Sequence, residues 1–165
     1  KEVQKAEKAR EAGECMGEAL PELRDIMHKI KETYDVSKEN VGVGSTIFAV
    51  KPGDGSAREQ AASCQKVLGG WANIANEYAT KRYRSNLINW GMLPFIIDKG
   101  ELPFTNGDYI FIPKIADAVK NKATSMKAYV VNKDMKEFEL KMDELTDDER
   151  EIILDGCLIN YYRNH

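Results

Sequence analysis

The sequence predicts an α/β fold, and three observations support this class. Short apolar, β-branched segments alternate along the chain with segments whose apolar residues recur at helical spacing. Glycine-rich turns separate these segments, and a hairpin pattern near the C-terminus adds an antiparallel part to the sheet. The 165 residues are 42% hydrophobic and 31% charged, which is typical of one globular domain.

The first 36 residues predict helices. Residues 1–14 are rich in Lys, Glu and Ala, which favours a charged surface helix. Apolar residues then recur at steps of three and four, which predicts a second helix packed on a core: Leu20, Leu23, Met27, Ile30 and Tyr34. We therefore divide the chain into an N-terminal helical segment, residues 1–40, and a main part, residues 41–165, within a single domain overall.

Residues 45–97 alternate between strand and helix patterns. The expected strands cover 45–50, 71–79 and 95–97, and the expected helices cover 57–68 and 80–90. Gly69-Gly70 ends the first of these helices and Gly91 the second. Because residues 45–50 are β-branched and apolar, we expect that strand to be buried.

The C-terminal third predicts a strand, a helix, a hairpin and a final helix. Asn106-Gly107 predicts a turn before a strand at 108–112, and residues 114–122 fit a short helix. Residues 127–132 and 136–142 predict a hairpin. The final helix begins at a capping box, Thr146 to Glu149, and continues with an apolar face that reaches Tyr161.

Charge and composition exclude several classes of function. The formal net charge is −3, so no overall basic field attracts nucleic acid or an anionic membrane. The longest apolar runs are far shorter than the roughly 20 residues of a membrane span. Three widely spaced cysteines without a CxxC pair, Cys15, Cys64 and Cys157, argue against a disulfide framework and against a metal site built from this chain alone. We expect a cytoplasmic protein.

The turn between the first strand and the next helix carries the candidate chemistry. Gly53 and Gly55 let the backbone approach a ligand closely. Ser56 lies at the expected helix start, where free N–H groups favour an anion. Arg58 is able to contact a carboxylate or phosphate with two donors. These residues predict a small-anion site in which Ser56 lies beside the anion.

A structural role for Ser56 competes with this interpretation. Ser56 and Glu59 have the spacing of a capping box, and most serines in this pattern only cap the helix. On the pattern alone the capping role is the more favoured of the two, although one serine is able to fill both. A phosphate loop is a weaker alternative, because the GxxxxGK[ST] pattern is absent.

Two segments of this region resemble a known family. Gly53 to Ala62 reads Gly-Asp-Gly-Ser-Ala-Arg-Glu-Gln-Ala-Ala, similar to the Gly-x-Gly-Ser-Ser-Arg-Glu-His-Ala-Ala signature of the C-terminal swivel domain of the aconitase family. Asn86 to Pro94 resembles that family's Asn-Leu-x-x-x-Gly-x-Leu-Pro segment, in the same order and at similar spacing. The clear resemblance covers residues 45–95.

The resemblance implies a hydro-lyase that dehydrates and hydrates a hydroxy di- or tricarboxylic acid. Ser56 matches the family's catalytic base and Arg58 its carboxylate-binding arginine, with Gly53, Gly55 and Ala57 forming the anion-binding loop. Ala57 replaces the second serine of the signature and Gln60 replaces its histidine, which indicates a divergent branch. The implied fold is a three-layer swivelling β/β/α domain with a mixed sheet.

The resemblance also implies a cofactor and a partner. The family's [4Fe–4S] cluster is held by other domains or by a partner subunit, and the three cysteines of this chain do not match its ligands. Since the chain starts at Lys1 rather than Met, we expect it to be part of a larger enzyme and to be inactive alone. The implied partners are the cluster-bearing domains or large subunit and a small carboxylic acid.

Two other functions remain as alternatives. Residues 78–84 combine tyrosines with Lys and Arg, which is compatible with RNA binding, although a solvated helix face fits the negative net charge better. A catalytically silent structural domain of the same fold is supported by Ala57 and opposed by the retained Ser56 and Arg58.

Overall fold

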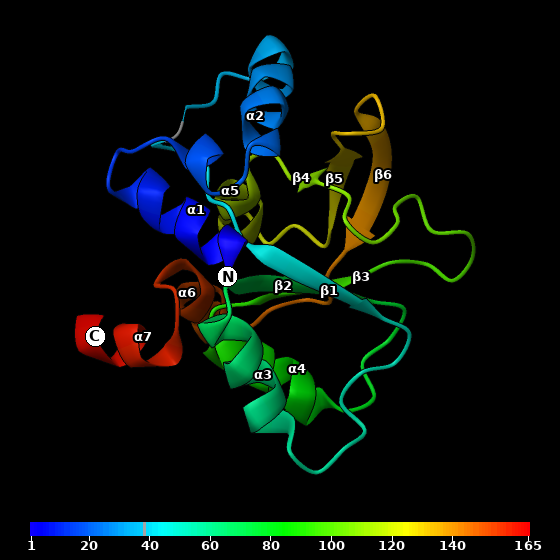
Figure 1. Cartoon of the computed structure of the whole chain (residues 1–165). Helices are drawn as coiled ribbons and strands as arrows, with labels where there is room; N and C mark the ends of the chain where they lie inside the picture. The colour runs from blue at the N-terminus through cyan, green and yellow to red at the C-terminus, as the bar shows by residue number, and fades with distance from the viewer. Residues whose placement is uncertain (38) are drawn as a thin grey trace.

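The computed structural model describes residues 1–37 and 39–165, which form a curled, six-stranded mixed sheet with helices on both sides (Figure 1). The strands are β1 (Ser45–Ala49), β2 (Gly70–Ala75), β3 (Leu93–Ile96), β4 (Ile110–Phe111), β5 (Ser125–Val130) and β6 (Lys136–Lys141). The helices are α1 (Glu2–Glu11), the 3-10 helix η1 (Met16–Glu18), α2 (Glu22–Thr33), α3 (Arg58–Val67), α4 (Lys81–Asn89), α5 (Ile115–Lys120), α6 (Asp147–Leu154) and α7 (Leu158–Asn164).

The sheet consists of a parallel half and an antiparallel half. Its strand order is β1-β2-β3-β6-β5-β4. β2 runs parallel to both β1 and β3, and α3 and α4 form the crossovers. β6, β5 and β4 pair antiparallel, and the two halves meet at one pairing position, Ile96 with Lys141. The α/β class and the mixed sheet predicted from the sequence are confirmed.

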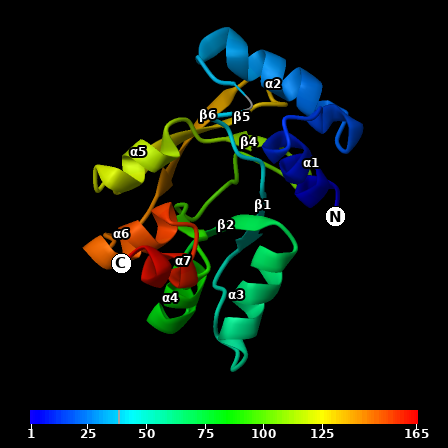
Figure 2. The ribbon, with the colours of Figure 1, turned by 90° about the vertical axis from the view of Figure 1, so that its left-hand side faces the viewer.

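Helices cover the two sides of the curled sheet with separate apolar clusters. Figure 2 shows α3, α4, α6 and α7 on one side of the parallel strands and α1 and α2 on the other. The main core lies between the sheet and helices α4 to α6, and its buried members include Phe95, Leu140 and Ile152. A second cluster joins α3 to α4, and a third, around Ile30, joins α2 to β4. The site-bearing helices α3 and α4 therefore pack directly on each other.

Most predicted elements are present at nearly the predicted bounds, but β1 is not a buried strand. It lies at the edge of the sheet, pairs only with β2, and leaves Ile47 46% exposed. The apolar pattern of residues 45–50 correctly predicted the strand. The burial predicted from the same pattern is wrong, because edge position depends on the strand order of the whole sheet.

Two further elements differ from their predicted extent. β2 ends at Ala75 rather than residue 79, and the segment beyond it pairs with the loop after β1 through Glu77 and Ala79, while the Asn76 side chain donates to the carbonyl oxygen of Ile97 over 3.0 Å. The predicted final helix is two helices, α6 and α7, separated at Gly156, which has φ +91°. A β-carbon on Gly91 would lie 1.8 Å from the Gly156 carbonyl oxygen, so this break packs closely on the end of α4.

Candidate functional site

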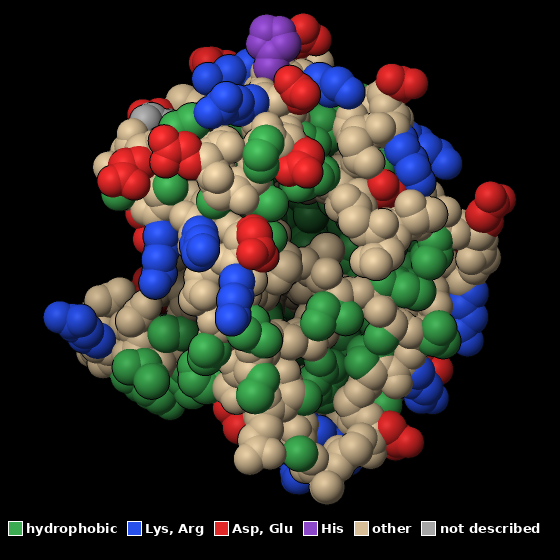
Figure 3. Space-filling model, viewed as in Figure 1, with side chains coloured by type: hydrophobic (Ala, Val, Ile, Leu, Met, Phe, Trp, Pro, Cys, Tyr) green, Lys and Arg blue, Asp and Glu red, His purple; other side chains and the backbone are tan. Residues whose placement is uncertain are grey.

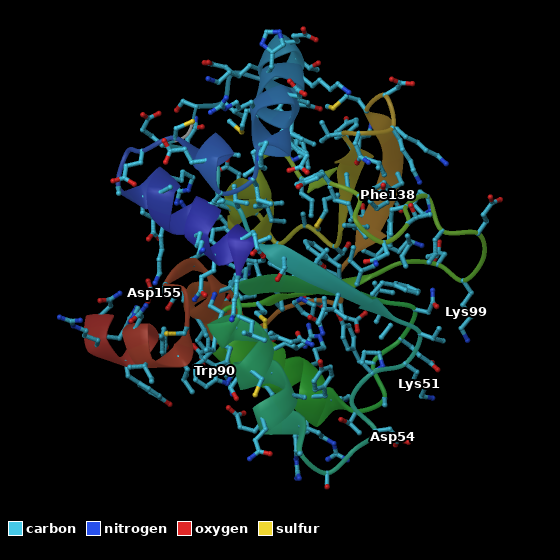
Figure 4. The ribbon with its side chains drawn as sticks, in the orientation of Figure 1. Lys51, Asp54, Trp90, Lys99, Phe138 and Asp155 are labelled. Atoms are coloured by element: carbon cyan, nitrogen blue, oxygen red, sulfur yellow. The ribbon has the colours of Figure 1, made fainter. Side chains whose placement is uncertain are left out.

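The candidate site is the loop that joins β1 to α3. Parallel pairing of β1, β2 and β3 places their carboxyl ends on one edge of the sheet, where ligands of α/β proteins bind. Figure 4 labels Lys51 and Asp54 on this loop. The loop and the first residue of α3 carry all the residues that the sequence predicted for the site: Gly53, Gly55, Ser56, Ala57 and Arg58.

The loop after β1 is paired with the loop after β2. The backbone N–H of Glu77 donates to the Val50 carbonyl oxygen over 3.2 Å, and that of Ala79 donates to the Pro52 carbonyl oxygen over 2.9 Å. Lys51 and Glu77 form an ion pair at 3.0 Å, which lowers the pKa of the Glu77 carboxyl. These contacts fix the first half of the candidate site against a neighbouring segment.

Gly53 is the position where the loop needs a glycine. Its φ is +96°, and a β-carbon there would lie 2.4 Å from the β-carbon of Tyr83 in α4. Its carbonyl oxygen accepts hydrogen bonds from Nε of Arg58 at 3.0 Å and from Oγ1 of Thr80 at 3.3 Å. Gly55 differs, since a β-carbon there would meet open space.

The capping role expected for Ser56 is wrong. The N-cap of α3 is Ala57, and no side chain caps this helix. Ser56 lies before the cap, is exposed, and its hydroxyl forms no hydrogen bond with any residue that the structure describes. Its side chain is therefore open to a ligand that approaches the start of α3.

Glu59, the other half of the expected capping box, instead binds the second helix of the site. Its carboxylate accepts from Nε1 of Trp90 at 2.6 Å and from the side-chain amide of Asn86. The two sequence segments that carry the family resemblance are therefore joined by direct side-chain contacts between α3 and α4.

Arg58 is half-buried and is oriented by the loop that precedes it. Its Nε donates to Gly53, and neither of its terminal amino groups has a partner among residues 1–37 and 39–165. An arginine held by Nε alone keeps both terminal donors for a carboxylate or phosphate. Together with Ser56 and the N-terminus of the ten-residue α3, it forms a surface suited to a small anion.

Thr80 and Tyr83 contact the candidate loop, although the sequence predicted neither of them as a site residue. Thr80 is the N-cap of α4 and accepts from the N–H of Tyr83 at 3.2 Å. Tyr83 is 3% exposed, packs beneath Gly53, and accepts through its hydroxyl from the Asn73 side chain at 3.0 Å. A threonine directly before a helical segment is a capping signal, so Thr80 was detectable from the sequence.

The tyrosines and Arg84 of the 78–84 stretch form internal contacts rather than a basic, aromatic surface. The hydroxyl of Tyr78 donates to the Phe95 carbonyl oxygen at 2.9 Å, and burial strongly raises its pKa. Arg84 donates to the carbonyl oxygens of Asp143 and Glu144. Lys81 and Arg82 are exposed on α4, as a solvated helix face predicts, whereas Tyr83 is buried and Tyr78 is half-buried, so the stretch does not present two exposed aromatic rings.

Other features of the described residues lie apart from this loop. Within the described part of the chain, no group of three or more His, Cys, Asp or Glu side chains is placed to hold a metal ion. A hollow of about 750 Å³, visible in Figure 3, opens between β1, β4 and α5 and is lined by none of the candidate site residues. No helix in the described residues is both long and apolar enough to span a membrane.

Comparisons with known proteins match this chain to one family. The family model "Aconitase C-terminal domain" matches residues 28–100. Aconitate hydratase A from Rickettsia bellii is 29% identical over 152 residues, which is 88% of this chain and 17% of that protein. The crystal structure of 3-isopropylmalate dehydratase from Methanocaldococcus jannaschii is 30% identical and aligns with a TM-score of 0.54, covering 84% of this chain and 75% of the other.

The residues that match the family model include β1, the candidate loop, α3, β2, α4 and β3. The match therefore contains the whole candidate site. The described residues also adopt the mixed α/β architecture that the resemblance implied. This chain belongs to the aconitase C-terminal domain family.

Proposed function

We propose that this chain is the domain that supplies a serine base and a carboxylate-binding arginine to an aconitase-like hydro-lyase. Its substrate is a hydroxy di- or tricarboxylic acid that is reversibly dehydrated. One observation carries the proposal. The exposed Ser56 and the half-buried Arg58 lie on one loop, and Gly53 orients Arg58 while leaving its two terminal amino groups for a ligand.

In the proposed reaction, Arg58 binds a substrate carboxylate and Ser56 removes the proton from the adjacent carbon. Serine is a very weak acid, so its alkoxide needs stabilisation from nearby N–H donors and the arginine charge. The free N–H groups at the start of α3 are suited to that role. Because the family's second serine is Ala57 in this chain, we propose a substrate other than citrate.

The proposal places the remaining chemistry outside this chain. In the family a [4Fe–4S] cluster is held by other domains or a partner subunit, where it would supply Lewis-acid chemistry, and the residues described here do not fit such a group. We therefore assign no reaction step at the cluster to the residues of this chain. The division into residues 1–40 and 41–165 and the cytoplasmic location stay predictions.

The test of this function is Ser56→Ala in the intact enzyme that contains the domain. We expect turnover to fall by at least about 100-fold, because the general base is removed, while the fold and cluster content are retained. The measurement is kcat with a panel of hydroxy di- and tricarboxylic acids, together with circular dichroism.

Ser63→Ala is the matched control for this substitution. Ser63 lies on the same helix, and its hydroxyl donates only to the Gln60 carbonyl oxygen. Its loss should leave kcat within about twofold of wild type. Near-normal kcat in Ser56→Ala would show that Ser56 is not the base. Absence of turnover in the wild-type enzyme with every acid would favour the catalytically silent alternative.

A further inference from the structure

The carbonyl oxygen of Gly53 is held by two side chains from different elements. Arg58 donates to it from the first turn of α3 over 3.0 Å, and Thr80 donates from the start of α4 over 3.3 Å. Gly53 itself has a φ of +96° and packs against the side chain of Tyr83 in α4. The oxygen is therefore a fixed acceptor that orients Arg58.

Thr80 makes two contacts with one hydroxyl. The oxygen accepts from the N–H of Tyr83 and so caps α4, while its proton is donated to Gly53. The cap fixes the rotamer of Thr80, and the rotamer fixes the direction of the donated hydrogen bond. Through this hydroxyl, α4 determines where the Gly53 carbonyl points.

We propose that Thr80 is a positioning residue that acts through Arg58. By holding the Gly53 carbonyl, it keeps Nε of Arg58 in one orientation and thereby aims the two terminal amino groups at the substrate carboxylate. This inference rests on the proposed function, and it adds a residue from outside the family signature to the carboxylate site.

The primary test is Thr80→Val in the intact enzyme. Valine keeps the shape of threonine but lacks the hydroxyl, so the Gly53 carbonyl loses one donor. We expect KM for the acid to rise about three- to tenfold, because carboxylate binding is weakened in the ground state and transition state alike, with a smaller fall in kcat, because the Arg58 charge also stabilises the Ser56 alkoxide. Thr80→Ser, which keeps the hydroxyl, should restore KM to within about twofold of wild type.

Thr146→Val separates positioning from helix capping. Thr146 is the N-cap of α6 and accepts from the N–H of Glu149, as Thr80 does from Tyr83, but it does not contact the candidate loop. Its substitution should lower stability by a similar amount and leave KM unchanged. Thr80→Ala, which leaves room for a water molecule at the cap, is measured in parallel and keeps the test valid if the valine variant does not fold.

A double-mutant cycle tests whether Thr80 acts through Arg58. Arg58→Lys removes Nε and the bidentate fork, so KM should rise at least about tenfold. Adding Thr80→Val to Arg58→Lys should then raise KM by less than about a further twofold, since the group that Thr80 positions is already absent. Full additivity in this cycle would overturn the inference.

Two other outcomes distinguish this inference from the function on which it rests. If Ser56→Ala abolishes turnover while Thr80→Val and Thr80→Ala have the KM of Thr146→Val, the positioning role is wrong and the proposed function stands. If Ser56→Ala retains near-normal kcat, the proposed function fails and the role of Thr80 fails with it.

Discussion

Asp108 is a loop carboxylate whose side chain is only 8% exposed and is surrounded by hydrogen-bond donors. It accepts from the backbone N–H of Thr105 at 2.8 Å, from the Asn132 amide at 2.9 Å and from Nζ of Lys133 at 2.9 Å. The backbone hydrogen bond contributes most, followed by Asn132 and Lys133, and together they hold the pKa of Asp108 well below its usual value. One side chain thus ties the 105–108 turn to the β5–β6 hairpin.

Asp108 should make the stability of this protein sensitive to acid. Its folded-state pKa is lowered, so its contribution is complete above the unfolded pKa of about 3.9 and is lost as pH falls below that value. We expect the free energy of unfolding to fall less between about pH 6 and about pH 3 in Asp108→Asn than in wild type. Urea unfolding at the two pH values measures the difference.

The control for this prediction is Asp54→Asn, because Asp54 is exposed and its side chain has no partner in the described part of the chain. It should keep the acid sensitivity of wild type. Equal losses of stability in wild type and Asp108→Asn would contradict the assignment.

The same four-residue pattern has different outcomes at two places in this chain. Thr146 and Glu149 form the predicted capping box, with both reciprocal hydrogen bonds present. Ser56 and Glu59 have the same spacing but form neither of these bonds: α3 begins one residue later than the pattern predicts, with Ala57 as its N-cap, and the Glu59 carboxylate accepts from Trp90 and Asn86. The local pattern reveals neither the later helix start nor the distant partners of Glu59.

At the scale of elements, Glu59 is the main polar link between α3 and α4. It lies beside the apolar cluster of Ala62, Tyr83, Leu87 and Met92, which packs the same two helices together. Hydrogen bonds from Trp90 and Asn86 to a charged carboxylate are stronger than those between neutral groups. Both motifs of the family resemblance therefore meet at this helix pair.

Replacing Glu59 should loosen the helix pair. We expect Glu59→Ala to lower the free energy of unfolding by about 1–2 kcal/mol, since two charge-assisted hydrogen bonds at a partly solvated site are lost. Chemical denaturation measures the effect. Gln60→Ala, at the exposed neighbouring position, should change stability by less than about 0.5 kcal/mol, and an equal effect of both substitutions would contradict the role of Glu59.

Element identity was largely predictable because it depends on local periodicity. The alternation over residues 45–97 gave β1, α3, β2, α4 and β3 in the correct order. Element ends were harder to predict. β2 stops at Ala75, next to Asn76, whose side chain hydrogen bonds to Ile97, and the last helix breaks at Gly156, which has a positive φ and lies against Gly91. Both ends coincide with contacts between segments far apart in sequence.

At the scale of the molecule, the proposed function makes this chain one part of a larger catalytic unit. The chain spans 17% of the length of the aconitate hydratase that it matches. We expect the purified chain alone to show no turnover of hydroxy di- or tricarboxylic acids, because the group that takes the hydroxyl belongs to other domains in the proposal. Turnover should appear when the cluster-bearing part of the enzyme is supplied.

Steady-state assays of the chain alone, of the cluster-bearing part alone and of their mixture measure this dependence. The mixture with Ser56→Ala is the control for trace activity of the cluster-bearing part. Turnover by the chain alone would contradict the division of chemistry proposed here.

Only part of the candidate site was predictable from the sequence. The glycine-rich turn, Ser56 and Arg58 were identified from local pattern and family resemblance. The shared Gly53 carbonyl was not, because it depends on Thr80, which is brought close only by the pairing of the loops after β1 and β2. The pairing of these two loops cannot be predicted from a single sequence.

The two halves of the sheet meet at the single pairing position between β3 and β6. They differ in the length of the connections that join their strands, and therefore in the chain entropy that is lost when those strands pair. The β5–β6 hairpin is closed by the short connection between Val130 and Lys136, whereas β1 and β2 are joined by the longer loop and helix between Ala49 and Gly70. Closing a longer connection costs more chain entropy. The candidate site lies on that longer connection, so the part of the chain that carries the proposed chemistry costs more chain entropy to order than the hairpin does.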